Sequence, residues 1–264
     1  WIVNNEGKKV KFRMNKFQAF VFDNKWNLNI ILKARQLGLS TFIEIYILDT
    51  LLFKSNVTAG IIDATLPDAK KKLEKIKFAY ENFAFDYPKL REEFLKIRRL
   101  IDDNVQELSF NNGSSVTADT TFRGSTLQIL HVSEHAKTCK NDPIKAREIR
   151  TGALNAVGLN QQIFIESTAE DAEGDFYDLC QKAERLHLEK AVLTLLDFKF
   201  FFFPWWENEE YSLECPSDFV FSAESANYFN ALEVEIGRTL TRNQKFWYVK
   251  KKETQDEDMK KEYP

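Results

Sequence analysis

The sequence predicts an α/β fold, with a doubly wound, mainly parallel sheet flanked by helices and a small C-terminal helical subdomain. Short apolar runs alternate with longer amphipathic stretches over most of the chain, which is typical of parallel strands joined by helices. Hydrophobic residues make up 44% of the 264 residues, enough for a substantial core. After about residue 204 the alternation stops and only helical patterns follow.

The elements are expected in the following order. The apolar runs predict strands over 28–32, 57–63, 126–134, 161–169 and 191–198. The amphipathic stretches predict helices over 41–53, 67–83, 142–157, 174–186, 222–237 and 240–255. Asn112-Gly113 stands between two alternating segments and predicts a hairpin over 105–118. We therefore expect a sheet domain over 1–204 and a helical subdomain over 205–264.

Composition excludes several classes of protein. A formal net charge of -3 does not fit a protein that coats nucleic acid through a strongly basic surface. The three cysteines are far apart and have no metal-ligand spacing, so we expect reduced thiols in an intracellular protein. No signal peptide is evident, and no apolar run approaches the ~20 residues that span a bilayer. We expect no membrane association.

The stretch "LKARQLGLST", from Leu32 to Thr41, resembles a phosphate-binding loop whose lysine is displaced. A strand, a loop with Gly38 and a helix that starts with Ser40-Thr41 provide the context of such a site, because helix N-termini attract anions. The usual pattern places a lysine just before the Ser or Thr, but this chain has Leu39 there. Lys33 and Arg35 precede the glycine and could supply the charge. An ordinary strand-to-helix turn is the alternative.

The stretch "LQILHVSE" has the form of the magnesium-site strand of phosphate-loop ATPases, an apolar run with an acidic tip. Glu134 could orient or deprotonate the attacking water. The preceding position, which is ordinarily an aspartate that holds Mg²⁺, is Ser133. A hydroxyl can bond a metal-bound water but adds no charge. A strand that ends in a solvated loop is the simpler alternative.

The same stretch contains a rival motif. "HVSEH", from His131 to His135, matches the inverted zinc-peptidase pattern H-x-x-E-H. On a helix the two imidazoles could share a zinc ion. The apolar run before them favours a strand, which would separate them by about 13 Å. No third ligand stands out in the sequence.

Three weaker signals complete the pattern. "IESTA" ends a predicted strand with Ser167, Thr168 and Ala169, a polar tip that could sense the γ-phosphate. Arg123 in "FRGST" precedes Glu134 and could reach a phosphate in its own site or in a neighbour's. Gln18 lies upstream of the loop, and its amide could read the adenine edge. Each also has an ordinary structural explanation.

Together, in this order, these phrases resemble the large terminase subunit of tailed bacteriophages and prophages, over nearly the whole chain. Members of that family pump double-stranded DNA into empty capsids, and their phosphate loops often carry the lysine at the start. The segments "FFFPWW", "LTRNQKFWYVKKK" and "KEYP" resemble the family's linker region. The resemblance implies a P-loop NTPase fold that binds ATP and Mg²⁺. It also implies that a nuclease domain would follow Pro264, so no nuclease activity is expected of this chain.

The resemblance assigns roles residue by residue. Lys33 matches the phosphate-binding lysine, Arg35 a second cation and Glu134 the catalytic glutamate. The remaining matches are Gln36 and Gly38 in the loop, Ser40 and Thr41 at magnesium, Ser167, Thr168 and Ala169 in the coupling motif, Gln18 at adenine, and Arg123 as the arginine proposed to act on a neighbouring subunit's ATP. Ser133 departs from the family's aspartate.

The function expected from these matches is an ATPase motor of viral DNA packaging. Its expected partners are double-stranded DNA, the capsid portal protein and the small terminase subunit, with a homo-oligomeric ring formed on the portal in the host cytoplasm. The basic stretches 70–77 and 89–100 are candidate DNA-facing patches, although solvated helix faces explain them more simply. The alternatives are a helicase-like nucleic-acid ATPase, a zinc peptidase and a nucleotide-binding scaffold that does not hydrolyse.

Overall fold

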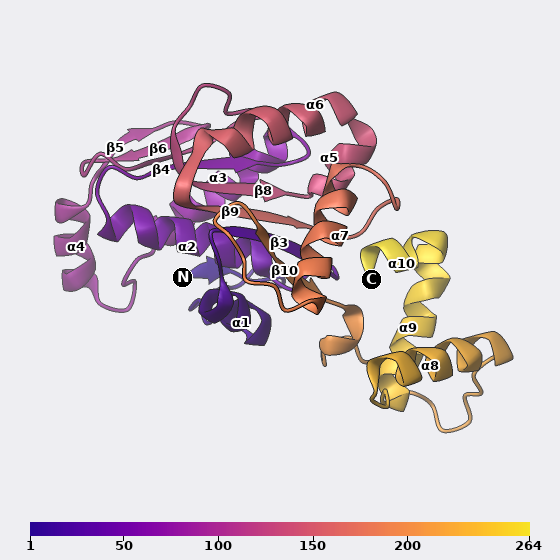
Figure 1. Ribbon diagram of the computed structural model, residues 1–264. Helices are drawn as coiled ribbons and strands as arrows, with labels where there is room; N and C mark the ends of the chain where they lie inside the picture. Colours follow the sequence, from indigo (N-terminus) through magenta and orange to yellow (C-terminus); the bar gives the residue numbers. More distant parts are fainter.

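The structure, a computed structural model, describes residues 1–264 and contains an eight-stranded sheet with helices on both faces (Figure 1). The strands stand in the order β10-β3-β9-β8-β4-β7-β6-β5. The pairings from β10 to β7 are parallel, and those of β6 with β7 and β5 are antiparallel. The strands are β3 (Leu28–Lys33), β4 (Thr58–Ile62), β5 (Leu100–Asp103), β6 (Glu107–Phe110), β7 (Ser115–Ala118), β8 (Leu127–Ser133), β9 (Val157–Ser167) and β10 (Phe198–Phe203).

Helices connect the parallel strands, and a separate two-stranded hairpin opens the chain. The hairpin pairs β1 (Ile2–Val3) with β2 (Lys9–Val10). The helices are α1 (Lys16–Asn24), α2 (Leu39–Phe53), α3 (Leu66–Glu81), α4 (Pro88–Ile97), α5 (His135–Asn141), α6 (Pro143–Glu148), α7 (Asp175–Leu188), α8 (Ala223–Ile236), α9 (Arg242–Gln255) and α10 (Met259–Glu262). None of these helices combines the length and the apolar character needed to cross a bilayer. The predicted α/β fold class is confirmed.

One predicted strand is wrong. Residues 191–197 form no strand, and the edge strand β10 lies immediately after them in "FKFFFF". The side chains of Val192 and Leu196 are 95% and 70% exposed. Asp197 accepts hydrogen bonds from the N–H and the hydroxyl of Thr194, at 3.0 and 2.6 Å, which closes a turn. The apolar letters of this segment therefore do not mark a buried strand.

Apolar side chains form two cores, one on each face of the sheet. Helices α1, α2 and α3 cover one face, where 36 buried residues make the larger cluster. Residues of α5 and α7 cover the opposite face with a cluster of 15 residues. Because strand side chains alternate between faces, the strands β3, β4, β8, β9 and β10 each contribute to both cores. Ile31 of β3, for example, belongs to the larger cluster and Ile30 to the smaller one.

Polar residues gather where the strands end on the α2 face. On each of four neighbouring strands, an apolar residue of this face is followed two positions later by a polar residue near the carboxyl end. The sequence runs are Ile31 to Lys33 in β3, Phe164 to Glu166 in β9, Ile129 to His131 and Ser133 in β8, and Ile61 to Asp63 at β4. Strand alternation places these polar side chains in one row beside the N-terminus of α2.

Beyond β10 the chain is helical, as expected. The indole of Trp205 is fully buried and lies 4.7 Å from the ring of Tyr248 in α9, and its cluster is continuous with the larger sheet core. Figure 1 shows α8 and α9 standing beside the sheet, with α10 turned back toward it. The boundary between 204 and 205 stays a prediction.

Candidate functional site

The loop between β3 and α2 has a backbone conformation that favours anion binding. Gln36 and Gly38 both have positive φ, at 57° and 73°. The backbone N–H groups of Gln36, Leu37 and Gly38 donate no hydrogen bond within the protein. Successive N–H groups with this kind of alternating backbone form a concave anion site. The loop and the N-terminus of α2 together can therefore hold a phosphate chain.

Two side chains from α1 brace this loop. Asn15 and Gln18 form a capping box at the start of α1. The amide nitrogen of Asn15 donates to the carbonyl of Leu37 at 3.0 Å, and that of Gln18 donates to the carbonyl of Gly38 at 2.7 Å. The amide oxygen of Gln18 accepts from the N–H of Asn15 at 2.9 Å. Both ends of the Gln18 amide are thus engaged within the protein, and its reading of adenine stays a prediction.

The displaced lysine points into the site. Lys33 ends β3, and its side chain is only 7% exposed. Its Nζ lies 3.1 Å from Oε2 of Glu166 and 3.8 Å from Oε1 of Glu134. Burial alone would lower the pKa of Lys33, but the two carboxylates outweigh it and raise the pKa. Lys33 is therefore a fixed cation at the start of the loop between β3 and α2.

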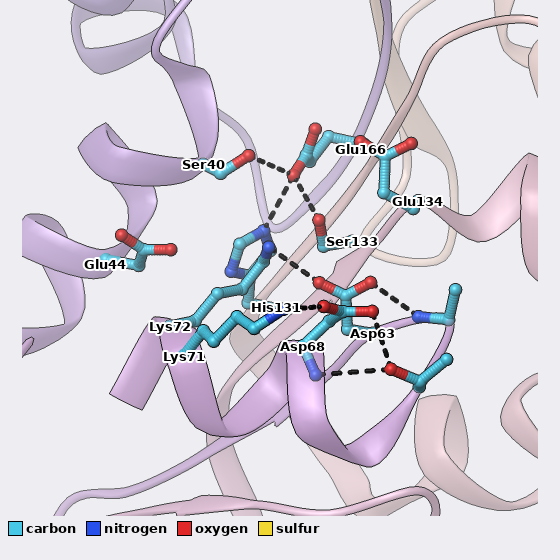
Figure 2. A network of polar contacts seen from close by, with 12 residues as sticks. Ser40, Glu44, Asp63, Asp68, Lys71, Lys72, His131, Ser133, Glu134 and Glu166 are labelled. Atoms are coloured by element: carbon cyan, nitrogen blue, oxygen red, sulfur yellow. Dashed lines mark hydrogen bonds and ion pairs between the residues drawn. The ribbon is translucent and has the colours of Figure 1, made fainter. Parts of the chain in front are cut away.

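Glu166 is the centre of the polar network in Figure 2, and sequence reasoning did not single it out. Its Oε1 accepts hydrogen bonds from Ser40 and Ser133, each at 2.6 Å, and contacts Nε2 of His131 at 3.3 Å. The residue is fully buried. Burial would raise its pKa, but Lys33 and the hydrogen bond from His131 hold the pKa well below its ordinary value. Glu166 is therefore ionised.

Glu134 stands at the edge of this network. It follows β8 and caps α5 with φ 52° and ψ 40°, a left-handed backbone that is uncommon for a residue with a side chain. Its side chain is 33% exposed, so water can reach the carboxylate. Burial and the charge of Glu166 raise its pKa, against the opposing effect of Lys33. A carboxylate with a raised pKa is a better base near neutral pH.

A second ion pair, between Asp63 and Lys72, lies beside the polar residues at the strand ends. Asp63 follows β4, and one of its oxygens lies 2.6 Å from Nζ of Lys72 in α3. Burial would lower the pKa of Lys72, but the charges of Asp63 and Glu166 outweigh it and raise that pKa. The backbone carbonyl of Asp63 also accepts from Lys145 at 2.7 Å. This pair links α3 to the site, and no sequence motif indicates it.

Glu44, on the next turn of α2 after Ser40, is another buried acid that the motifs missed. Neither carboxyl oxygen has a hydrogen-bond partner, and Nζ of Lys75 lies 3.9 Å away. Burial is the main reason that its pKa rises to about 8. Glu44 and Thr41 line a separate cavity of about 460 Å³ against α3 and the N-terminal hairpin. Ser40 rather than Thr41 thus reaches the network around Glu166.

Two predicted cations lie away from this network. The guanidinium of Arg35 is 52% exposed and lies 2.7 Å from Oε1 of Glu262 in α10. Arg123 is exposed on the loop before β8 and packs beside Gly152. Neither contacts a residue of the network, so their action on phosphates stays a prediction.

The predicted coupling segment connects the site to two other parts of the chain. The hydroxyl of Ser167 accepts from the N–H of Ala136, two residues after Glu134, at 3.3 Å. Thr168 is buried, and the N–H of Ala169 donates to the carbonyl of Lys261 in α10 at 3.0 Å. The end of β9 therefore contacts both α5 and the helical tail.

The zinc alternative finds no ligand set. His131 lies in β8 and contacts Glu166, whereas Nε2 of His135 in α5 contacts Asp175 at 3.2 Å. The two imidazoles thus serve different carboxylates, and no group of three His, Cys, Asp or Glu side chains is placed to hold a metal. A cavity of about 630 Å³ lies between α5, α7 and β10 on the opposite face of the sheet from the network.

The sequence and the fold were compared with those of known proteins. No family model and no curated protein matches the sequence. Among solved structures, the large terminase ATPase domain of Thermus phage P74-26 aligns with 100% of this chain and 98% of its own, at 13% identity and a TM-score of 0.51. A mutant of that domain gives 12% identity and a TM-score of 0.53. The HK97 bacteriophage large terminase aligns with 92% of this chain and 48% of its own, at 15% identity and a TM-score of 0.56. The chain therefore has the fold of a large terminase ATPase domain.

Proposed function

We propose that the protein is the ATP-hydrolysing motor of viral DNA packaging, which translocates double-stranded DNA into a procapsid. One observation carries the proposal. Lys33 lies between the carboxylates of Glu166 and Glu134, at the start of a loop in which the N–H groups of 36–38 have no partner within the protein. An anion site, a fixed cation and a water-accessible carboxylate meet in one place, as ATP hydrolysis requires.

The triphosphate would lie in the loop with its oxygens on the N–H groups of 36–38 and of the first turn of α2. Lys33 would then exchange a carboxylate partner for the γ-phosphate and stabilise the charge of the transferring group. Asn15 and Gln18 hold the loop in this shape before nucleotide arrives. Such preorganisation lowers the cost of binding because the loop does not need to be ordered.

The residues at the strand ends also fit Mg²⁺, a cation that prefers oxygen ligands and usually retains several waters. The hydroxyls of Ser40 and Ser133 and the carboxylate of Glu166 offer such oxygens, and Oε2 of Glu166 receives no hydrogen bond. Bound Mg²⁺ would supply charge neutralisation at the phosphates. Ser40 would hold it directly, with Ser133 bonding a water of its shell.

Glu134 would orient the attacking water and accept its proton. The side chain is partly exposed and is close enough to Lys33 for both to act on one terminal phosphate. Its left-handed backbone fixes the start of α5, so the carboxylate is held at the strand end. The raised pKa agrees with a role in proton transfer.

The adenosine end would lie beside the loop. A cavity of about 280 Å³ there is lined by residues that include Asn15, Phe17, Gln36 and Leu37, together with Asn208 of the segment after β10. We expect Gln18 to shape this cavity through its hydrogen bond to the carbonyl of Gly38. Its amide would read adenine only after release of one of its present hydrogen bonds.

Coupling to DNA would pass through the end of β9. Loss of phosphate would shift Ser167–Ala169, whose bonds to Ala136 and Lys261 connect it to α5 and to the tail. The basic helix faces at 70–77 and 89–100 are candidate DNA contacts. Phosphate contacts of this kind are blind to sequence and sensitive to salt, which suits a motor that releases DNA in every cycle.

The motor would work as an assembly with other proteins. We propose a homo-oligomeric ring on the capsid portal protein in the host cytoplasm, with the small terminase subunit delivering DNA. In such a ring the exposed Arg123 could reach the nucleotide of the neighbouring subunit. A nuclease domain in the same polypeptide would cut the DNA.

The test is ATP turnover by the protein assembled with portal and double-stranded DNA, compared with each component alone. We expect turnover to rise with DNA and portal together, and DNA to become protected from added nuclease inside the procapsid. Turnover with strand separation but no protection would favour a helicase-like ATPase. Nucleotide binding without turnover in the full assembly would favour a scaffold.

A further inference from the structure

The acid that the magnesium-site strand lacks is present on the neighbouring strand. β8 and β9 are parallel neighbours, and their register places Ser133 directly beside Glu166. Both side chains point to the α2 face, because each lies an even number of residues after a member of the larger core. Position 133 has no carboxylate, but Glu166 on the neighbouring strand places one beside it.

The contacts of Glu166 are those of a metal-site carboxylate rather than those of a simple counter-ion. A counter-ion for Lys33 would need only the ammonium, which lies 3.1 Å from Oε2. Oε1 instead accepts from Ser40, the first hydroxyl of the phosphate-loop helix, and from Ser133, both at 2.6 Å. Figure 2 shows these hydroxyls converging on one oxygen. A serine that donates its proton to a carboxylate keeps the lone pairs of its oxygen available to a cation.

We propose that Glu166 is the magnesium-site carboxylate of this protein, displaced by one strand from the usual position, and that it would hold Mg²⁺ together with Ser40. The inference rests on the proposed ATPase function. The imidazole of the fully buried His131 contacts the same oxygen at 3.3 Å. Ser133 is then a hydrogen-bond donor to the relocated acid rather than a degenerate ligand.

The first experiment measures metal binding directly. Mn²⁺ replaces Mg²⁺, and its affinity for the complex with a non-hydrolysable ATP analogue is measured by electron paramagnetic resonance. We expect Glu166→Gln, which keeps the shape of the side chain, to weaken Mn²⁺ binding by about 10–100-fold. The matched control is Glu44→Gln, which also removes a buried acid from this region but contacts neither hydroxyl. The control should bind Mn²⁺ like the wild type.

The second experiment moves the acid back. The double variant Ser133→Asp/Glu166→Ser exchanges the two groups across the strand pair. We expect it to regain most of the Mn²⁺ affinity lost in Glu166→Gln, with circular dichroism confirming that each variant is folded. A folded exchange variant without any recovery would overturn the relocation.

The outcomes separate this inference from the proposed function. Wild-type protein that binds no ATP analogue, with or without metal, would overturn both. Wild-type protein that binds the metal–nucleotide complex while Glu166→Gln binds Mn²⁺ equally well would overturn the inference alone. Weakening in Glu166→Gln but not in Glu44→Gln, followed by recovery in the exchange variant, would establish it.

Discussion

Nζ of Lys33 lies 3.1 Å from Oε2 of Glu166, and both side chains are almost completely buried. The pair joins β3 to β9, and because both side chains are buried, solvent has little access to either charge. A buried charge that loses its partner costs about 3–5 kcal/mol of folding free energy. The lysine is therefore expected to contribute to stability as well as to chemistry.

We predict that Lys33→Ala abolishes ATP turnover and lowers the free energy of unfolding by about 3–5 kcal/mol while the domain remains folded. Adding Glu166→Gln should restore part of the stability, because no unpaired carboxylate is left, but none of the turnover. Urea unfolding and steady-state hydrolysis check both. Arg35→Ala is the control, since its exposed pair with Glu262 is worth at most about 1 kcal/mol. Lys33→Ala protein with near-normal turnover would remove the proposed mechanism.

Glu134→Gln should lower ATP turnover by about 10²–10⁴-fold and leave nucleotide binding nearly unchanged. The amide cannot accept the proton of water, whereas the loop and Lys33 that hold the phosphates are untouched. Parallel measurements of turnover and of binding to a fluorescent ATP analogue separate the two effects. Glu173→Gln, an exposed acid away from the network, should retain turnover. Equal turnover in both variants would refute the assignment of the base.

Glu44 should make stability depend on pH. Burial raises its pKa from an ordinary value near 4.5 to about 8. The folded state therefore binds a proton that the unfolded state releases, so this contribution is fully present below pH 4.5 and is lost as pH rises through 8. Glu44→Gln should match the wild type at pH 5 and be more stable at pH 9, by on the order of 1–4 kcal/mol.

Urea unfolding of both proteins at the two pH values tests the effect of Glu44. His135 also has a raised pKa, of about 9, although burial opposes the effect of its partners Asp175 and Cys139. Its contribution likewise falls as pH rises, but it is common to both proteins and cancels in their difference. A stability difference that does not change with pH would show that Glu44 is ionised in the folded state.

Arg123 should act between subunits if the protein works as a ring. Each of the variants Arg123→Ala and Glu134→Ala should be inactive alone in the assembly with portal and DNA. Mixed rings contain interfaces in which a wild-type Arg123 faces a wild-type Glu134, so mixing should restore part of the turnover. Turnover measured across mixing ratios gives the test, and no recovery at any ratio would argue against shared sites.

The sequence was sufficient for the fold because the alternation of strands and helices is strong. It also identified the loop, Lys33, Ser40, Ser133 and Glu134, which the structure brings close to one another, although their roles stay predictions. β10 was misplaced because "AVLTLLDF" and "FKFFFF" are both apolar. Only three-dimensional packing shows that the second run pairs with β3 and the first is exposed.

Glu166, Asp63 and Glu44 could not be predicted for a different reason. The chain visits the strands in the order β3, β4, β8, β9, but the sheet places β9 between β3 and β8. Glu166 touches Lys33 and Ser133 only because of this crossover. An isolated acid at the end of an apolar run, as in "QQIFIES", was the available signal, and by itself it does not differ from a solvated strand end.

The C-terminal segment 261–264 makes three backbone hydrogen bonds to other parts of the chain. Carbonyls of Lys261, Glu262 and Pro264 accept the amide protons of Ala169, Arg35 and Trp205 at 3.0 to 3.1 Å. The last turn of the chain thus touches both the phosphate loop and the strand tip that would sense hydrolysis. We expect any movement that separates these two loops to lengthen or break these hydrogen bonds, and increased deuterium uptake at the Arg35 and Ala169 amides would report it.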